Sequence, residues 1–110
     1  MKARRVFVFW IHPLFYTSVR LLLNDPNIEL VGAASDPAAA HEQIMGLQPD
    51  TIILEEGGET IFAEVFTYLL VRSSFRRIIG LNLDDNQLSV YHREQKTVGQ
   101  VDDLLQLVLQ

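Results

Sequence analysis

Residues 6–23, VFVFWIHPLFYTSVRLLL, decide how the first part of this chain folds. Residues 6–11 form an unbroken apolar run rich in β-branched and aromatic side chains, which is typical of a strand covered on both faces, as in a parallel sheet. Pro13 then suits the first turn of a helix, where its missing N–H costs nothing. An apolar stripe at helical spacing follows, made by Leu14, Phe15, Val19, Leu22 and Leu23. The stretch therefore predicts the first strand and first helix of an α/β domain.

The alternation of strand and helix patterns continues beyond this opening. Strands are predicted over residues 28–34, 51–54 and 78–83 from their apolar, β-branched composition. The pair Asp36-Pro37 predicts a helix start, and Gly46 is a plausible end for that helix. Helical spacing predicts another helix over residues 59–73. This order implies right-handed crossovers and a parallel sheet.

The pattern changes after the fourth strand. Residues 84–87 are too few for a helix, and residues 88–93 alternate roughly, which predicts an antiparallel hairpin with the strand over 78–83. This hairpin strand stands in place of a parallel fifth strand or beside it. Residues 97–99 continue as irregular strand, and residues 102–109 form a last amphipathic helix. We therefore expect a single domain over residues 1–110, a three-layer α/β/α flavodoxin-like fold with strand order 2-1-3-4 and a modified last strand.

Composition narrows the function classes. The 110 residues include no cysteine, which excludes disulfides, thiol catalysis and cysteine metal sites. The net charge of −5 and the scattered basic residues disfavour nucleic-acid binding. No apolar run approaches the roughly 20 residues that span a bilayer, so we expect a cytoplasmic protein without a membrane partner. The initial Met1 and the helical finish suit a complete chain.

Four strings, in order, carry a resemblance to a known family. They are HPLF at 12–15, NIELVGAA at 27–34, LQPDTIIL at 47–54 and DLL at 103–105. Together they resemble the receiver domain of bacterial response regulators, above all the subgroup fused to helix-turn-helix output domains. In that family two acids after the first strand bind Mg²⁺, an aspartate ending the third strand accepts a phosphoryl group, a Ser/Thr ends the fourth strand and a lysine ends the fifth.

This sequence departs from the family at each of those positions. Trp10 and Ile11 stand at the acidic pair, Glu55 at the phospho-acceptor, Asn82 at the Ser/Thr, and Thr97 at the lysine. Mg²⁺ requires oxygen ligands, and the first two side chains offer none. Without the metal, the charge that develops on a transferring phosphoryl group loses its main stabiliser. The resemblance therefore implies a degenerate receiver that is not phosphorylated.

Two interpretations remain open for Glu55. It is either a permanent negative charge in place of a phospho-aspartate, or a solvated acid at a strand end; Glu56 beside it favours the second. Asn82 is placed to hydrogen-bond it. The crevice at this edge would be lined by Trp10, Ile11, His12, Glu55, Glu56, Gly57 and Asn82. Trp10 would either fill this crevice or stack on a small aromatic ligand.

A metal site is not predicted. The three histidines, His12, His41 and His92, combine with Glu55 and Glu56 into no standard ligand spacing. The glycine pair at 57–58 lacks the pattern of a phosphate-binding loop. We therefore expect no cofactor and no catalytic residue.

The predicted function is a non-enzymatic, phosphorylation-independent signalling module that acts through a protein partner and forms a homodimer. Its contact surface is predicted at the hairpin edge, with Phe75, Val90 and Tyr91 as contact residues. The alternative is that the charged residues Arg93, Glu94 and Lys96 shield this edge. Two alternatives stay open. One is a phospho-accepting receiver with a displaced site at Glu55 or at Asp84 and Asp85. The other is a small-molecule sensor that uses the crevice near Trp10.

Overall fold

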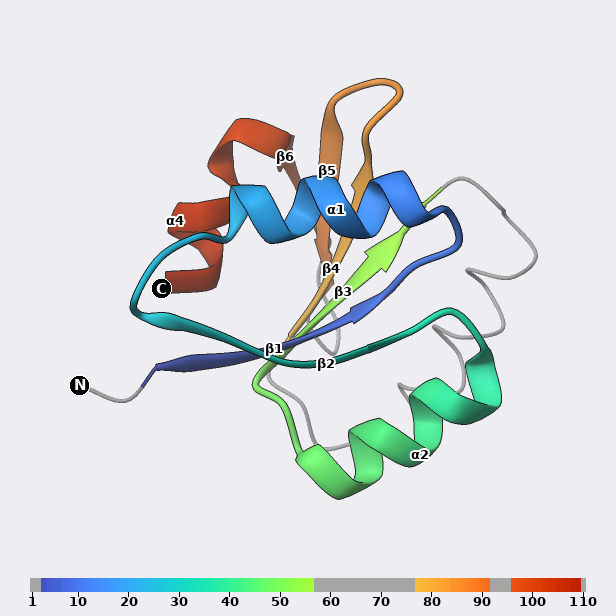
Figure 1. Ribbon diagram of the computed structural model, residues 1–110. Coiled ribbons are helices and arrows are strands. Elements are labelled where there is room, and N and C mark those ends of the chain that lie inside the picture. Colours follow the sequence, from blue (N-terminus) through green and yellow to red (C-terminus); the bar gives the residue numbers. More distant parts are fainter. Residues whose placement is uncertain (1–2, 57–76, 92–95, 110) are drawn as a thin grey trace.

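A computed structural model describes residues 3–56, 77–91 and 96–109 of the chain. Its elements follow one another in the order shown in Figure 1. They are β1 (Arg4–Phe9), α1 (Pro13–Leu22), β2 (Ile28–Ala34), α2 (Pro37–Leu47), β3 (Thr51–Glu55), β4 (Arg77–Asn82), β5 (Gln87–Tyr91), β6 (Lys96–Gln100), a short 3-10 turn η1 (Val101–Asp103) and α4 (Leu104–Leu109). The helix expected over residues 59–73 lies outside the described residues.

One sheet holds all the described strands, in the order β2-β1-β3-β4-β5-β6. The first four pair in parallel, β4 and β5 pair antiparallel, and β5 and β6 pair antiparallel. The predicted strand order 2-1-3-4 and the hairpin on β4 are therefore confirmed. Because two antiparallel pairings restore the chain direction, β6 runs the same way as β4, and the hairpin strand lies beside this last strand rather than replacing it.

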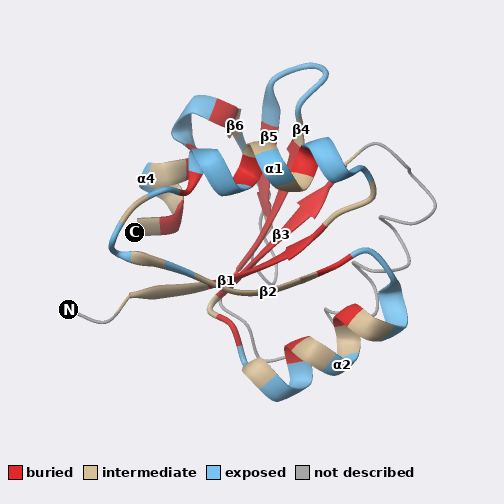
Figure 2. Ribbon diagram, viewed as in Figure 1, coloured by how far each residue is buried: buried red, intermediate tan, exposed pale blue. Residues whose placement is uncertain are grey.

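Helices lie on both faces of the sheet (Figure 1), and two apolar clusters fill the space beneath them. On one face, α1 and α4 pack on alternate strand residues such as Val6, Ile53 and Ile79. On the other face, α2 packs on Phe7, Ile52 and their neighbours. Both faces of β1, β3 and β4 are buried (Figure 2), as their continuous apolar sequences predict.

Local sequence signals set the helix starts. Pro13 occupies the first turn of α1, and the Asp36 side chain caps α2 by accepting a hydrogen bond from the Ala39 N–H at 3.0 Å. The end of α2 differs from the prediction. The helix passes Gly46 and stops at Gln48, which adopts the left-handed conformation with φ of 51°.

The apolar stripe of α1 is correct only in part. Phe15, Val19 and Leu23 are buried, whereas Leu14 is 79% exposed and Leu22 is 39% exposed. Leu14 precedes Phe15 by one residue, about 100° around the helix, so a helix that buries Phe15 and Val19 turns Leu14 outward. Figure 2 shows this outer side of α1 as exposed.

Arginine side chains cap the C-terminal ends of α2 and α4. Arg5 donates from its guanidinium to the carbonyl oxygens of Leu47 and Gln48 at 2.6 and 3.1 Å, at the end of α2. Arg77, which is 9% exposed, donates to the Leu107 carbonyl of α4. These carbonyls have no partner within their helices, and a cation there also opposes the negative end of the helix dipole.

In the described part of the chain, no helix is both long and apolar enough to cross a membrane.

Candidate functional site

Three parallel strands end together at one edge of the sheet, and the residues that follow them form the candidate site. The register pairs Phe9 of β1 with Leu54 of β3, and Glu55 of β3 with Leu81 of β4. The turn 10–12 leads from β1 into α1 at this edge. Since β1 lies between β2 and β3, the strand order reverses here, where open α/β sheets most often bind ligands.

Glu55 lies at the centre of this edge, held by the turn that precedes α1. Its Oε1 accepts hydrogen bonds from the backbone N–H groups of Ile11 at 2.7 Å and His12 at 2.9 Å, and its Oε2 pairs with Nδ1 of the His12 ring. We call this set of contacts the Glu55 clasp. Glu55 is only 8% exposed, so the interpretation of a solvated acid is wrong. The carboxylate is buried because donors from the turn replace its water.

The clasp also has a favourable electrostatic setting. His12 is the N-cap of α1, and its own side chain makes no capping hydrogen bond. The Glu55 carboxylate therefore supplies a negative charge close to the positive end of the α1 dipole. In return, the hydrogen bond and the charge of Glu55 raise the pKa of His12 above its ordinary value of 6.5, and Asp84 adds to the rise. The side chain of His12 is 72% exposed, so solvent screens much of this pairing.

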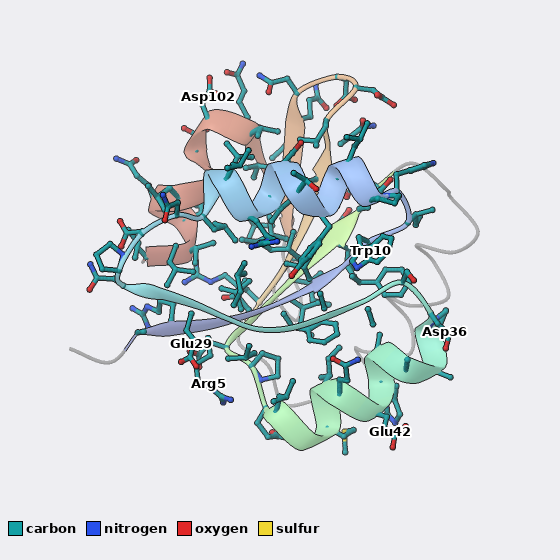
Figure 3. All side chains as sticks on the ribbon, viewed as in Figure 1. Arg5, Trp10, Glu29, Asp36, Glu42 and Asp102 are labelled. Atoms are coloured by element: carbon teal, nitrogen blue, oxygen red, sulfur yellow. The ribbon has the colours of Figure 1, made fainter. Side chains whose placement is uncertain are left out.

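Trp10 packs on the same face of the sheet as α1. Its ring stacks on Tyr16 with centroids 6.1 Å apart and an interplanar angle of 22°, and the Arg20 guanidinium lies 5.6 Å from the Tyr16 ring centre. Figure 3 shows Trp10 at the end of β1, next to the start of α1. The indole is partly buried against the core, while Ile11 packs on the opposite apolar cluster. Trp10 and Ile11, which the resemblance aligns with the acidic pair, are therefore part of the hydrophobic packing.

Glu56 turns to the other face of the sheet and lies across Gly80 of β4. A Cβ atom on Gly80 would come within 2.0 Å of Glu56 Oε1, so only glycine leaves room for this side chain. The same oxygen accepts a hydrogen bond from the Tyr91 hydroxyl at 3.2 Å, and the Glu56 N–H donates to Leu81 O at 2.8 Å. The side chains of the neighbouring acids Glu55 and Glu56 therefore lie on different faces of the sheet.

The structure brings Asn82 to the edge but not Thr97. Asn82 uses its side-chain oxygen to accept the Asp84 N–H at 3.0 Å, which shapes the turn after β4. Thr97 lies near the start of β6, opposite Val90, with β4 and β5 between it and β3. Since strands are spaced by about 4.8 Å, this places Thr97 roughly 14 Å from β3 across the sheet. The alignment of Thr97 with the end of a fifth strand is wrong, because the inserted β5 shifts the last strand outward.

The predicted contact residues of the hairpin edge also need correction. Val90 is 2% exposed and belongs to the core beneath α1 and α4, because β5 is an inner strand covered by β6. Tyr91 is partly buried and holds Glu56. Phe75 lies outside the described residues, as does His92. Among the residues that are described, no group of three or more His, Asp or Glu side chains is placed to hold a metal ion.

Comparison with known proteins agrees with this architecture. The structure matches the signal receiver domain of the response regulator NarL from Mycobacterium tuberculosis, with a TM-score of 0.57 and 30% sequence identity, over 74% of this chain and 68% of that domain. The chain belongs to the receiver domain family of response regulators. No protein-family model matches it.

A second match comes from sequence alone. Over 55 residues, or 49% of this chain, the sequence is 38% identical to protein-glutamate methylesterase/protein-glutamine glutaminase 2 of Vibrio vulnificus (strain YJ016). The matched segment is 16% of that protein, so the chain spans about a sixth of its length.

Two features of the site were not predicted from the sequence. The ring partner of Trp10 is Tyr16, which sits on the inner side of α1 next to Phe15 and carries no separate sequence signal. The role of Gly80 has a weak signal, since a lone glycine inside an apolar strand often marks a close approach by another group.

Proposed function

We propose that this receiver domain works without phosphorylation, as a non-catalytic module that acts through protein contacts. The observation that carries the proposal is the Glu55 clasp, in which both carboxylate oxygens at the phospho-acceptor position are already bound by Ile11 and His12. An oxygen that accepts hydrogen bonds from two backbone N–H groups has a reduced ability to attack phosphorus. The clasp holds the turn at residues 10–12 against the end of β3 without any modification of Glu55.

The missing metal ligands support the same proposal. Phosphoryl transfer depends on a divalent cation to neutralise the charge that develops on the transferred group. At the two positions next to Glu55, the indole of Trp10 and the side chain of Ile11 pack into apolar clusters and present no oxygen. The His12 ring already pairs with Oε2 of Glu55 and so competes with any Mg²⁺ for the same carboxylate.

A phosphodonor assay tests the proposal. The wild-type chain is incubated with acetyl phosphate and Mg²⁺ and its intact mass is recorded, with a receiver domain that has the acidic pair run in parallel. We expect no phosphoryl adduct on this chain and a clear adduct on the control. An adduct that disappears in E55Q would place the acceptor at Glu55, and an adduct that persists would indicate Asp84 or Asp85; either result overturns the proposal.

The indole of Trp10 tests the sensor alternative. One ring face already stacks on Tyr16, so a ligand would have to compete with this contact or use the opposite face. The chain has one tryptophan, so its fluorescence reports on this position alone. We expect the emission to stay unchanged across a panel of small aromatic metabolites. A saturable change in the wild type that is lost in Y16L would favour a sensor instead.

A further inference from the structure

Among the described strands, β6 is the outermost on its side of the sheet, and the backbone groups on its outer side point in regular directions. Val101 donates its N–H to Asn86 O at 3.2 Å, one step beyond the paired residues Gln87 and Gln100. Hydrogen-bonded and non-bonded pairs alternate in an antiparallel ladder, so Gly99 and Thr97 also bond to β5. The N–H and C=O groups of Lys96, Val98 and Gln100 therefore point away from the sheet.

One of these outward groups already has a partner. The Gln100 N–H donates to Asp103 Oδ2 at 3.2 Å, which closes the end of the edge. Within residues 3–56, 77–91 and 96–109, no strand pairs with the outer side of β6. Val98, at the middle of the strand, is 58% exposed. A short, regular edge with an exposed valine at its centre is a template for a further strand.

We propose that two copies of this chain pair through β6, antiparallel about a two-fold axis at Val98, to form one continuous sheet. In this register Val98 of each copy exchanges its N–H and C=O with Val98 of the other. The Lys96 N–H reaches the Gln100 C=O of the second copy. The exposed valines then become a directly opposed apolar pair.

Charge favours this occupant and this direction. The strand begins with Lys96 and is followed by Asp102 and Asp103, both exposed. Figure 3 shows Asp102 on η1, on the outer side of the molecule. Antiparallel pairing brings the basic start of each strand to the acidic end of the other, twice by symmetry. A parallel arrangement would place lysine beside lysine.

A cavity of about 200 Å³ lies next to this edge, where a second copy paired with β6 could place side chains. It is lined by Leu88, Val90, Val98, Gly99, Asp103, Gln106 and Leu107. In the proposed register Thr97 of the second copy stands opposite Gly99, which has no side chain of its own there. A five-residue strand buries little area, so we expect a weak, concentration-dependent dimer. The inference extends the proposed function by naming the surface through which it would act.

Disulfide trapping tests the register. Directly opposed, hydrogen-bonded residues of an antiparallel pair have Cα atoms about 5.5 Å apart, a separation that a disulfide spans. Since the chain has no cysteine, V98C offers a single thiol. We expect mild oxidation to convert V98C to a covalent dimer. The matched control is L21C on α1, where Leu21 is 74% exposed, and it should stay monomeric. Crosslinking of L21C but not V98C would overturn the proposal.

Sedimentation across a concentration series gives an independent measurement. V98K opposes two like charges at the axis and should raise the dimer dissociation constant by about tenfold, while V98T should leave it nearly unchanged. K96E should also weaken the dimer, and K96E/D102K should restore it. Circular dichroism is used to check that each variant is folded. A wild type that stays monomeric, or a dimer indifferent to V98K, would refute the interface. Phosphoryl uptake is measured separately, so either proposal can fail alone.

Discussion

Shortening Glu55 by one methylene tests the clasp directly. The substitution E55D restores the residue type that the family uses as acceptor, yet we expect it to destabilise this chain. The carboxylate retreats by about one C–C bond length, roughly 1.5 Å. From 2.7 and 2.9 Å, the contacts with the N–H groups of Ile11 and His12 then lengthen beyond hydrogen-bonding range.

The expected magnitude follows from these two bonds. A hydrogen bond to a charged group contributes about 1.5–3 kcal/mol, and the losses overlap because the turn relaxes as a unit. We therefore expect E55D to lower the free energy of unfolding by about 2–4 kcal/mol. The melting temperature should fall by the order of 10 °C. The exposed pairing with the His12 ring is left out of this figure, because solvent screens it.

Urea and thermal unfolding of the wild type and E55D measure this difference. The matched control is E29D, since Glu29 is an exposed acid on β2, and it should change stability by less than about 0.5 kcal/mol. If the free energy of unfolding of E55D equalled that of E29D, the Glu55 clasp would make no contribution to stability. The phosphodonor assay on E55D adds a second outcome. We expect no adduct, because the substitution exchanges one carboxylate for another and adds no further oxygen ligand for Mg²⁺ at Trp10 or Ile11.

Three further predictions concern the same fold. G80A should lower the unfolding free energy by about 1–3 kcal/mol, measured in urea, because its new Cβ displaces the Glu56 side chain. The raised pKa of His12 implies a stabilising contribution that is fully present below pH 6.5 and is lost as the pH rises through the higher folded-state pKa. H12Q should therefore flatten the stability–pH curve above pH 6.5, and an unchanged slope would refute the pairing with Glu55. R5M should cost about 1–2 kcal/mol in thermal unfolding by uncapping α2, whereas R20M, which loses only the exposed contact with the Tyr16 ring, should cost less.

Sequence patterns predicted the frame of this fold well because their causes are local. Pro13 and the pair Asp36-Pro37 mark helix starts through backbone chemistry that needs no tertiary contact. Continuous apolar runs likewise identify strands that are buried on both faces. The stripe of α1 was less accurate, since Leu14 and Phe15 are both apolar and only packing decides which of them turns inward.

The candidate site was predictable in its members but not in its contacts. The resemblance placed Glu55 beside the turn at residues 10–12, and the structure agrees. It could not show that Glu55 is bound by that turn, because the partners are more than forty residues apart in the chain and backbone N–H groups leave no trace in a sequence. Thr97 was misplaced for a topological reason, since residue counting cannot distinguish a last strand from one shifted outward by an inserted neighbour.

That inserted neighbour also changes how the chain connects its strands. A parallel successor to β4 ordinarily needs a crossover of about a dozen residues or more, usually with a helix. Here β5 reverses the chain after the short turn at 83–86, and β6 reverses it again, so the original direction returns without any crossover. Loop-closure entropy favours the shorter turn by about 1 kcal/mol. This chain of 110 residues thereby gains a wider sheet with a local connection, and its β4-β5-β6 part has the low contact order that speeds folding.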